Sequence, residues 1–259
     1  SMTNMFYNAD SFNVDISSWD VSSVTNMASM FRYASSFNQD ISDWDVSNVS
    51  NMILMFGNAE NFNQDLSSWD VSSVTNMNQI FNNAISFNGD ISGWNVSNVT
   101  DMTGVFFGAN NFNQDISDWD VSNATTMYVM FSGADNFNQD ISSWDVSSIM
   151  SMNQMFSSAD NFNQDLSSWD VSSVTNMSRM FFAASSFNGN ISAWDVSSVA
   201  NMEEMFDEAS SISDANKCVI HVSFSSNANW PYDWSENCTA AGYTSGCTDP
   251  YAANYDSTA

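Results

Sequence analysis

Aspartates recur at a fixed interval of 25 residues and are the side chains of this sequence best suited to chemistry. If one 25-residue repeat stacks on the next, equivalent residues form columns with a step of roughly 4.8 Å. Carboxylates on neighbouring repeats could then share a calcium ion, which takes oxygen ligands at about 2.3–2.6 Å. One column contains Asp15, Asp40, Asp65, Asp90, Asp115, Asp140 and Asp165, followed by Asn190; the other contains Asp20, Asp45, Asp70, Asn95, Asp120, Asp145, Asp170 and Asp195.

The second column is the better placed for binding, because the Trp and Val on either side of each aspartate alternate with it and are expected to point inward. We predict calcium ligands at Asp45, Asp70, Asp120, Asp145 and Asp170, within a wider acidic binding surface that adds Asp20, Asp195, Asp43 and Asp118. No D-x-D-x-D-G calcium loop is present. The alternative is that each aspartate accepts hydrogen bonds from nearby backbone N–H groups or serine hydroxyls, as in Asx turns.

An enzyme is not expected. His221 is the only histidine, and no spacing around it supports a Ser-His-Asp or Cys-His arrangement. Paired carboxylates could serve a glycosidase, but eight equivalent pairs of positions, six of them with two carboxylates, indicate architecture and not a single active site. A third column, Asn13 to Asn188 in steps of 25, has no exception and is predicted to satisfy backbone groups at a bend.

Two elements per repeat would position these columns. Trp44 and Val46 alternate with polar residues, which predicts a strand near 43–47. Met52, Met55, Phe56 and Ala59 have helical spacing, which predicts a short helix near 51–59. Such units cannot bury their apolar faces alone, so the fold class expected is α/β: a right-handed solenoid with a parallel sheet on one side, helices on the other, and the tryptophans and methionines inside.

The spacing Ile41-x-x-Trp44-x-Val46-x-x-Val49-x-x-Met52 resembles a leucine-rich repeat, with other apolar residues in place of leucine. The full unit "FNQDISSWDVSSVTNM", followed by MF and Ala, resembles the repeats of BspA-like leucine-rich-repeat surface proteins, a mycoplasma-type surface repeat. The resemblance covers roughly 1–210. It implies extracellular or cell-surface display, adhesion and protein–protein contact, and it brings no catalytic residues.

The period stops after Ser211, and three segments are expected: repeats over 1–210, a terminal cap over 211–240, and a further segment over 241–259. The final segment, with the pattern GCTDPxAxNY, resembles the start of a Cys-containing module that usually closes with a second cysteine. That second cysteine is absent, so Cys218 and Cys238 are the natural disulfide partners, and Cys247 is left over. The alternative is three reduced thiols.

A formal charge of −27, from three Lys+Arg and thirty Asp+Glu, makes nucleic acid and anionic membranes poor partners and favours divalent cations and basic proteins. No run approaches eighteen apolar residues, so membrane insertion is not expected, and the opening "SMTNMF" lies in mid-repeat, as in an expressed fragment. We predict an extracellular, non-catalytic adhesion module that binds another surface or protein through the acidic sheet face, with calcium assisting. The oligomeric state is open.

Two other functions remain open. One is a structural spacer or stalk. The other, an ice- or crystal-binding face, would use the column Thr25, Ser50, Thr75, Thr100 and Thr125, which Met150 and Ala200 interrupt.

Overall fold

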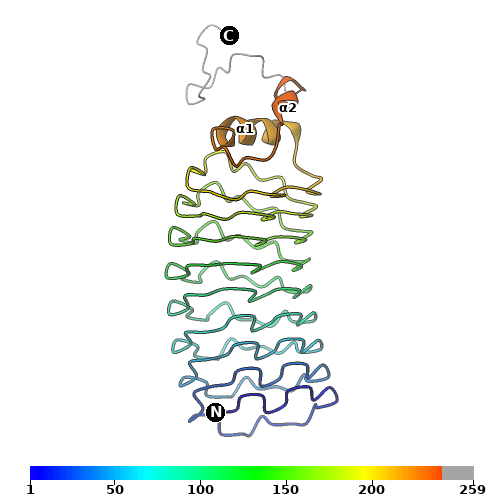
Figure 1. Ribbon diagram of the computed structural model, residues 1–259. Coiled ribbons are helices and arrows are strands. Elements are labelled where there is room, and N and C mark those ends of the chain that lie inside the picture. The colour runs from blue at the N-terminus through cyan, green and yellow to red at the C-terminus, as the bar shows by residue number, and fades with distance from the viewer. Residues whose placement is uncertain (241–259) are drawn as a thin grey trace.

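The computed structural model describes residues 1–240, in which the repeats wind as stacked coils (Figure 1). We call each 25-residue turn of the coil a rung. Isolated parallel β-bridges join equivalent residues of successive rungs, for example Asn26 to Asn51 and Thr126 to Ser151. Two helices, α1 (Asp214–Phe224) and α2 (Ser235–Ala240), lie at one end of the stack, and the N-terminus lies at the other (Figure 1).

The predicted α/β fold, a right-handed leucine-rich-repeat-like solenoid of sheet and helices, is wrong. Within residues 1–240 the pairing between rungs amounts to single bridges, and both helices lie after the last rung. The strand near 43–47 is absent because the chain turns every two or three residues. The Trp44 N–H donates to the Ile41 carbonyl at 3.1 Å, the Ser47 N–H to the Asp45 carboxylate at 3.1 Å, and the Val49 N–H to the Val46 carbonyl at 2.8 Å.

The helix near 51–59 is also absent, although its apolar stripe is real and buried. Overlapping turns replace it, with N–H to carbonyl bonds from Met55 to Met52 and from Ala59 to Phe56. Leu54 and Asn58 have φ of 53° and 58°, as the third residue of a type II turn requires. Turns that follow one another every four residues bring side chains to one side at the same three- and four-residue spacing as a helix.

Backbone hydrogen bonds between rungs hold this turn segment, and those made by its alternate N–H groups point one way along the stack. The N–H groups of alternate residues donate to carbonyls 24 positions later, at 2.6–3.0 Å, from Met52, Leu54, Phe56 and Asn58 to Asn76, Asn78, Ile80 and Asn82. The intervening N–H groups close the turns within the rung. Because both sets are used, the backbone of an interior turn segment needs neither a sheet nor a helix to satisfy its polar groups.

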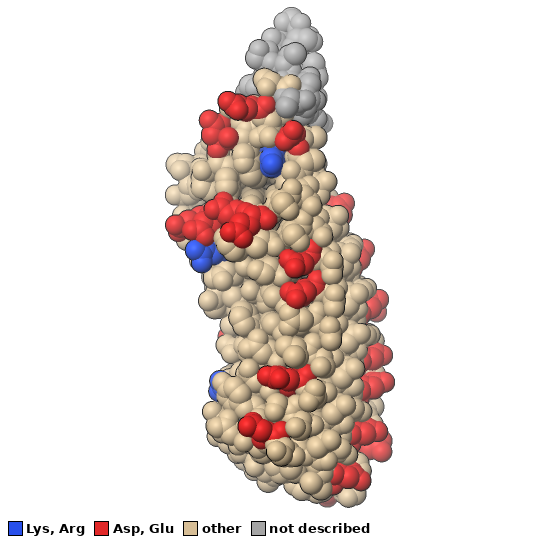
Figure 2. Space-filling view, turned by 90° about the vertical axis from the view of Figure 1, so that its right-hand side faces the viewer, with Lys and Arg blue, Asp and Glu red and all other residues tan. Residues whose placement is uncertain are grey.

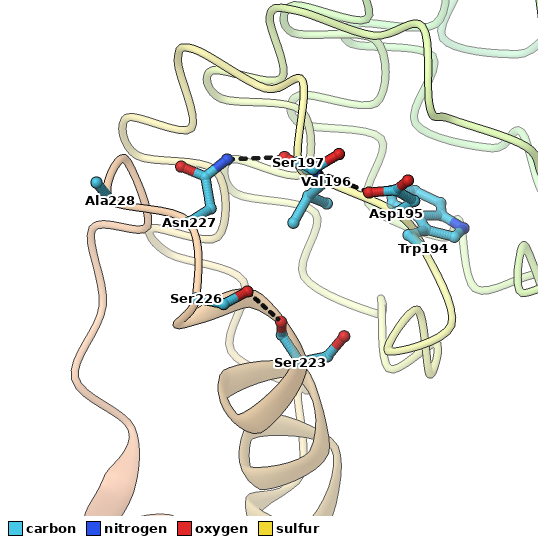
Figure 3. Close-up of a pocket in the computed structure, with 8 residues that line it drawn as sticks. All are labelled: Trp194, Asp195, Val196, Ser197, Ser223, Ser226, Asn227 and Ala228. Carbon is cyan, nitrogen blue, oxygen red and sulfur yellow. Dashed lines mark hydrogen bonds between the residues drawn. The ribbon is translucent and has the colours of Figure 1, made fainter. Parts of the chain in front are cut away.

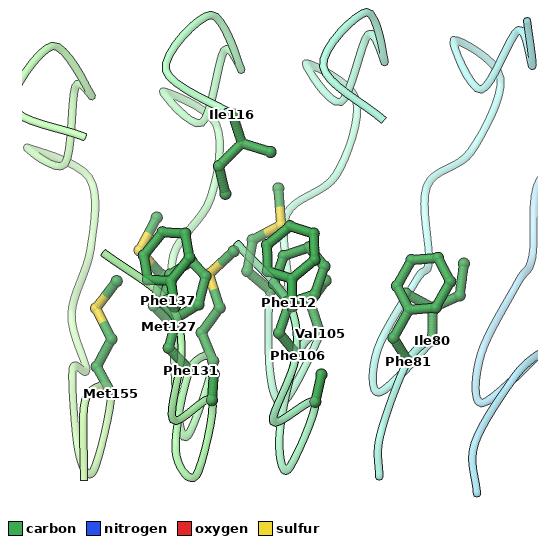
Figure 4. Close-up of a cluster of buried hydrophobic side chains, with 14 of the residues drawn as sticks. Ile80, Phe81, Val105, Phe106, Phe112, Ile116, Met127, Phe131, Phe137 and Met155 are labelled. Atoms are coloured by element: carbon green, nitrogen blue, oxygen red, sulfur yellow. The ribbon is translucent and has the colours of Figure 1, made fainter. Parts of the chain in front are cut away.

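The core is a set of parallel aromatic and aliphatic columns (Figure 4). Phe81 and Phe106, one rung apart, have ring centroids 5.9 Å apart and planes 6° from parallel, and the same geometry recurs along the stack. The tryptophans lie inside as predicted, with Trp44 to Trp194 only 2–4% exposed, while Trp19 in the first rung is 38% exposed. Each buried indole N–H donates to a carbonyl of the preceding rung; Trp119 donates to Ile91 at 3.1 Å. The paired methionines are core residues too, as predicted.

The segment after the last rung covers the end of the core. Ser213 caps α1, and Phe224 of that helix is fully buried. The Tyr232 hydroxyl accepts the Phe206 N–H at 2.8 Å, an N–H that donates to the next rung elsewhere in the stack. Cys218 in α1 and Cys238 in α2, the two cysteines paired in the sequence analysis, form a disulfide. Cys247 and the expected Cys-containing module lie outside the described residues.

Candidate functional site

Both aspartate columns are built from Asx turns. Each aspartate accepts the N–H of the residue two positions later, always a serine, and in many rungs its hydroxyl as well. At Asp145 the Oδ1 atom accepts the Ser147 N–H at 3.1 Å and the Ser147 hydroxyl at 2.6 Å. The same contact explains why the column positions are followed by serine throughout the repeats. The hydrogen-bonded reading of the aspartates is therefore correct for the Oδ1 atoms.

Asparagine replaces aspartate at one position in each column and makes the same turn. Asn95 Oδ1 accepts the Ser97 N–H at 3.1 Å, and Asn190 Oδ1 accepts the Ser192 N–H at 3.0 Å. The turn thus requires a side-chain oxygen two residues before serine and does not require a charge.

The hydrogen bonds stabilise the ionised form of the carboxylates. At Asp70 and Asp145 the serine hydroxyl, and then the serine N–H, lower the carboxyl pKa below its usual value. At Asp40 and Asp165 the serine N–H is the larger cause of the lowered pKa, and the neighbouring aspartate of the column opposes it by raising the pKa. The hydrogen bonds outweigh the repulsion at these four aspartates, so their carboxylates remain charged at neutral pH.

All nine aspartates predicted to bind are exposed. The Asx turns use Oδ1, and across residues 1–240 the Oδ2 atoms of Asp45, Asp70, Asp120, Asp145 and Asp170 have no hydrogen-bond partner. The column is not continuous, because Asn95 separates Asp70 from Asp120. In the same described part of the chain, no group of three or more His, Cys, Asp or Glu side chains is gathered closely enough to hold a metal ion. Any bound cation would therefore rely on carboxylates from two rungs, or on a partner.

Acidic side chains form a line along one edge of the molecule, whereas the few basic groups are scattered away from that edge (Figure 2). Asp43 and Asp118, also predicted to bind, stand directly before buried tryptophans and are exposed. They enlarge the acidic surface only in their own rungs, because the other rungs carry Ser, Gly or Ala at that position.

The repeat pattern matches a known family over most of the chain. Three overlapping stretches, 1–84, 64–149 and 116–219, match the family described as Mycoplasma protein of unknown function, DUF285. The chain belongs to this family. No curated protein matches it. Within residues 1–240, none of the helices of this DUF285 chain is both long enough and apolar enough to cross a bilayer.

The sequence reasoning missed the most variable surface of the DUF285 repeats. It lies on the turn segment, where residues between the buried positions, such as Ile53, Leu54 and Asn58, are partly exposed. Equivalents of Ile53 are Ala28, Asn78, Thr103, Tyr128, Asn153, Ser178 and Glu203. Both arginines lie here. The Arg32 Cζ atom lies 5.0 Å from the centroid of the Tyr33 ring, and Arg179 Nη2 forms a salt bridge of 2.7 Å with Glu204 Oε2. Comparison of the repeats position by position would have found this surface. It was missed because the segment near 51–59 was predicted as a helix, and a helix would place these residues differently.

One hollow brings a predicted aspartate next to the cap of this DUF285 chain (Figure 3). It lies where a further rung would stack, between Asp195 of the last rung, Ser223 in the last turn of α1, and Asn227 beyond the end of that helix. The Asn227 side chain donates to the Val196 and Val199 carbonyls at 2.7 and 2.9 Å, and the Ser223 hydroxyl donates to the Ser192 carbonyl at 2.7 Å. The polar groups of Ser223 and Asn227 are already used in attaching the cap to the last rung. The hollow therefore marks the junction between the cap and the stack of rungs.

Proposed function

We propose that this chain is a non-catalytic binding module displayed outside the cell. It attaches to another protein or surface through its exposed aspartates, chiefly the column from Asp20 to Asp195. The observation that carries the proposal is that the two oxygens of each column aspartate make different contacts. Oδ1 accepts the hydrogen bond that closes the Asx turn, and Oδ2 is left exposed in rung after rung. The resemblance to BspA-like surface repeats and membership of the DUF285 family support the same assignment.

Calcium is the proposed bridge. Exposed Oδ2 atoms of Asp45 and Asp70, or of Asp120, Asp145 and Asp170, would supply part of a coordination shell, and the partner or water would complete it. A cation bound only by the stacked form stabilises it by mass action, by about 2.7 kcal/mol when the free ion is a hundredfold above its dissociation constant. Neutralising one column would also reduce the repulsion between neighbouring rungs.

A calcium titration followed by EDTA tests this. We expect the melting temperature to rise with millimolar calcium beyond the rise from sodium chloride of equal ionic strength. The double variant Asp70→Asn with Asp120→Asn should blunt the rise while keeping its fold, because Asn95 shows that an amide closes the same turn. The matched control, Asp10→Asn with Glu60→Gln, removes two exposed charges outside the columns and should respond like the wild type.

Equal melting curves in calcium and in matched sodium would end the calcium proposal, and the aspartates would then be structural. Attachment is tested separately, by retention of the protein on immobilised cationic and neutral proteins with and without calcium. A spacer or stalk, which the closed hydrogen bonding within each rung favours, would show no retention on either. The threonine column offers little to ice, because the Thr75 and Thr125 hydroxyls donate to carbonyls of the preceding rung at 3.3 and 3.2 Å.

A further inference from the structure

The asparagine column predicted to be structural is closed by a second residue, in an arrangement that we call the amide clasp. Each Asn Oδ1 accepts the N–H of the equivalent Asn in the next rung, for example Asn138 from Asn163 at 2.9 Å. The glutamine beside that next Asn then folds back, and its Nε2 donates to the carbonyl of the Asn in the preceding rung. The glutamine clasps are Gln39 on Asn13, Gln64 on Asn38, Gln114 on Asn88, Gln139 on Asn113 and Gln164 on Asn138, at 2.8–3.0 Å.

The cap supplies the clasp for the last rung. Asn216 of α1 donates to the Asn188 carbonyl at 2.7 Å and to its Oδ1 at 3.0 Å. An amide N–H donor thus covers the asparagine carbonyl even where no further repeat exists. The exceptions are Asn63 and Asn163, which face Gly89 and Gly189 where the rungs at 39, 64, 114, 139 and 164 have glutamine.

The two glycines have different surroundings. A Cβ on Gly89 would lie 1.9 Å from the Gln64 carbonyl oxygen, so the backbone there has closed against the preceding rung. A Cβ on Gly189 would lie 3.4 Å from the equivalent Gln164 oxygen, and the nearest atoms are the edge of the Phe187 ring at 2.9 Å. The backbone therefore fills the place of the missing glutamine at Gly89, whereas that place stays open at Gly189.

The open gap is a shallow, polar hollow of about 370 Å³ on the surface. Asn163, Gln164, Asp165, Asn188 and Asn190 line it. The Asn163 carbonyl, which a glutamine would cover, has no donor among the described residues, and neither does Asp165 Oδ2. The Ser167 N–H holds Asp165 Oδ1 at 2.9 Å, and its hydrogen bonds lower the Asp165 pKa, so that carboxylate is charged.

A ligand for this pocket must replace a glutamine amide and also meet a carboxylate. It needs at least two N–H donors, one for the carbonyl and one for the carboxylate, and a positive charge to match the carboxylate. A guanidinium has five donors in a planar fork and no acceptor, whereas an ammonium is a compact charge without that geometry. The net charge of −27 would attract such a group to the surface.

We propose that the Gly189 pocket binds a guanidinium group, which donates to the Asn163 carbonyl in place of the missing glutamine and to the Asp165 carboxylate. The group belongs to an arginine side chain of a protein partner or to a free guanidinium compound. The site does not depend on the calcium of the proposed function, because Asp165 is in the other aspartate column. A failure of the calcium proposal would therefore leave the guanidinium proposal unaffected, and the reverse also holds.

The test uses ¹H–¹⁵N NMR of the side-chain amides in the full chain, titrated with acetyl-Gly-Arg-Gly-amide, with methylguanidinium and with neutral acetamide. We expect saturable shifts at Asn163, Asn188 and Asn190 with the guanidinium probes, and none with acetamide. Gly189→Gln, which installs the residue present at 39, 64, 114, 139 and 164, should lower the affinity at least tenfold. Its melting temperature is measured as well, because the new Cβ would lie 2.9 Å from the buried Phe187 ring and that ring must shift. Asp165→Asn should also weaken binding and keep its turn, as Asn190 does.

Binding of the tripeptide would assign the site to a protein partner. Binding of methylguanidinium with exclusion of the tripeptide would assign it to a small molecule. The proposal is overturned if neither binds, if acetamide binds as well as the cations, or if Gly189→Gln binds with unchanged affinity. Equal shifts at Asn138, whose clasp is complete, would also overturn it, because they would show general attraction of cations to the acidic surface.

Discussion

Replacing Trp119 by phenylalanine tests the hydrogen-bonded core. The indole is 2% exposed, its N–H donates to the Ile91 carbonyl at 3.1 Å, and its ring stacks on Trp94 at 6.3 Å with planes 4° apart. Loss of one buried hydrogen bond costs about 0.5–1.5 kcal/mol. The smaller ring leaves a void of roughly 40 Å³, which at about 24 cal/mol per Å³ costs roughly 1 kcal/mol. The Ile91 carbonyl still accepts the Trp94 N–H at 3.1 Å, so no orphaned acceptor adds to the cost.

We therefore expect Trp119→Phe to lower the free energy of unfolding by about 1.5–2.5 kcal/mol. Trp19→Phe is the matched control, because Trp19 is 38% exposed and its indole N–H has no partner among residues 1–240. That control should cost less than about 0.5 kcal/mol. The measurement is urea denaturation followed by the fluorescence of the remaining tryptophans, with an unchanged m-value as the check that both variants unfold alike. Equal losses from the two variants would refute the hydrogen-bonded stacking of the interior indoles.

Other predictions concern the Asx turns and the cap. Asp145→Asn should leave the melting temperature unchanged or higher, as Asn95 implies, whereas Asp145→Ala should cost up to about 1 kcal/mol because the turn loses its acceptor. Stability should fall on acidification below about pH 4, because hydrogen bonds lower the pKa of Asp40 and Asp140 in the folded state. The stabilisation from these two carboxylates is complete above their pKa in the unfolded chain and is lost as the pH falls through their pKa in the folded protein. Melting curves from pH 7 to pH 2 check the sign, and a midpoint that rises with acid would contradict it. Tyr232→Phe should cost about 1–2 kcal/mol and speed amide exchange at the last rung, since the hydroxyl accepts the Phe206 N–H; unchanged exchange there would show that the cap does not depend on this contact.

The buried residues were predictable from the sequence, but the backbone that buries them was not. Met52, Met55, Phe56 and Ala59 were assigned to the core, and all four are fully buried. Their spacing fits a helix and a chain of four-residue turns equally well. The deciding information was the hydrogen bonding between rungs, and a single repeat does not contain its neighbours' carbonyls. For the same reason Trp44 and Val46 were assigned correctly to the inside but to a strand that does not form.

The candidate site divides in a similar way. The Asx alternative for the aspartates was accessible from the sequence, because each is followed two residues later by a serine. The role of the glutamines was not accessible, because Gln164 acts on Asn138, a residue 26 positions away whose carbonyl is reached only when the rungs stack. Without that contact, Gly189 could not be recognised as a missing clasp.

The equivalence of the rungs has a genetic consequence. Residues 61–77 and 161–177 are identical in sequence, and each occupies surroundings that its neighbours reproduce. Unequal recombination between such copies would add or remove whole 25-residue units, and every new junction would again place Trp on Trp and Asn on Asn. The length of the molecule can therefore change in a lineage by single events without a new core having to evolve, whereas an insertion of one residue would disrupt every column at that rung.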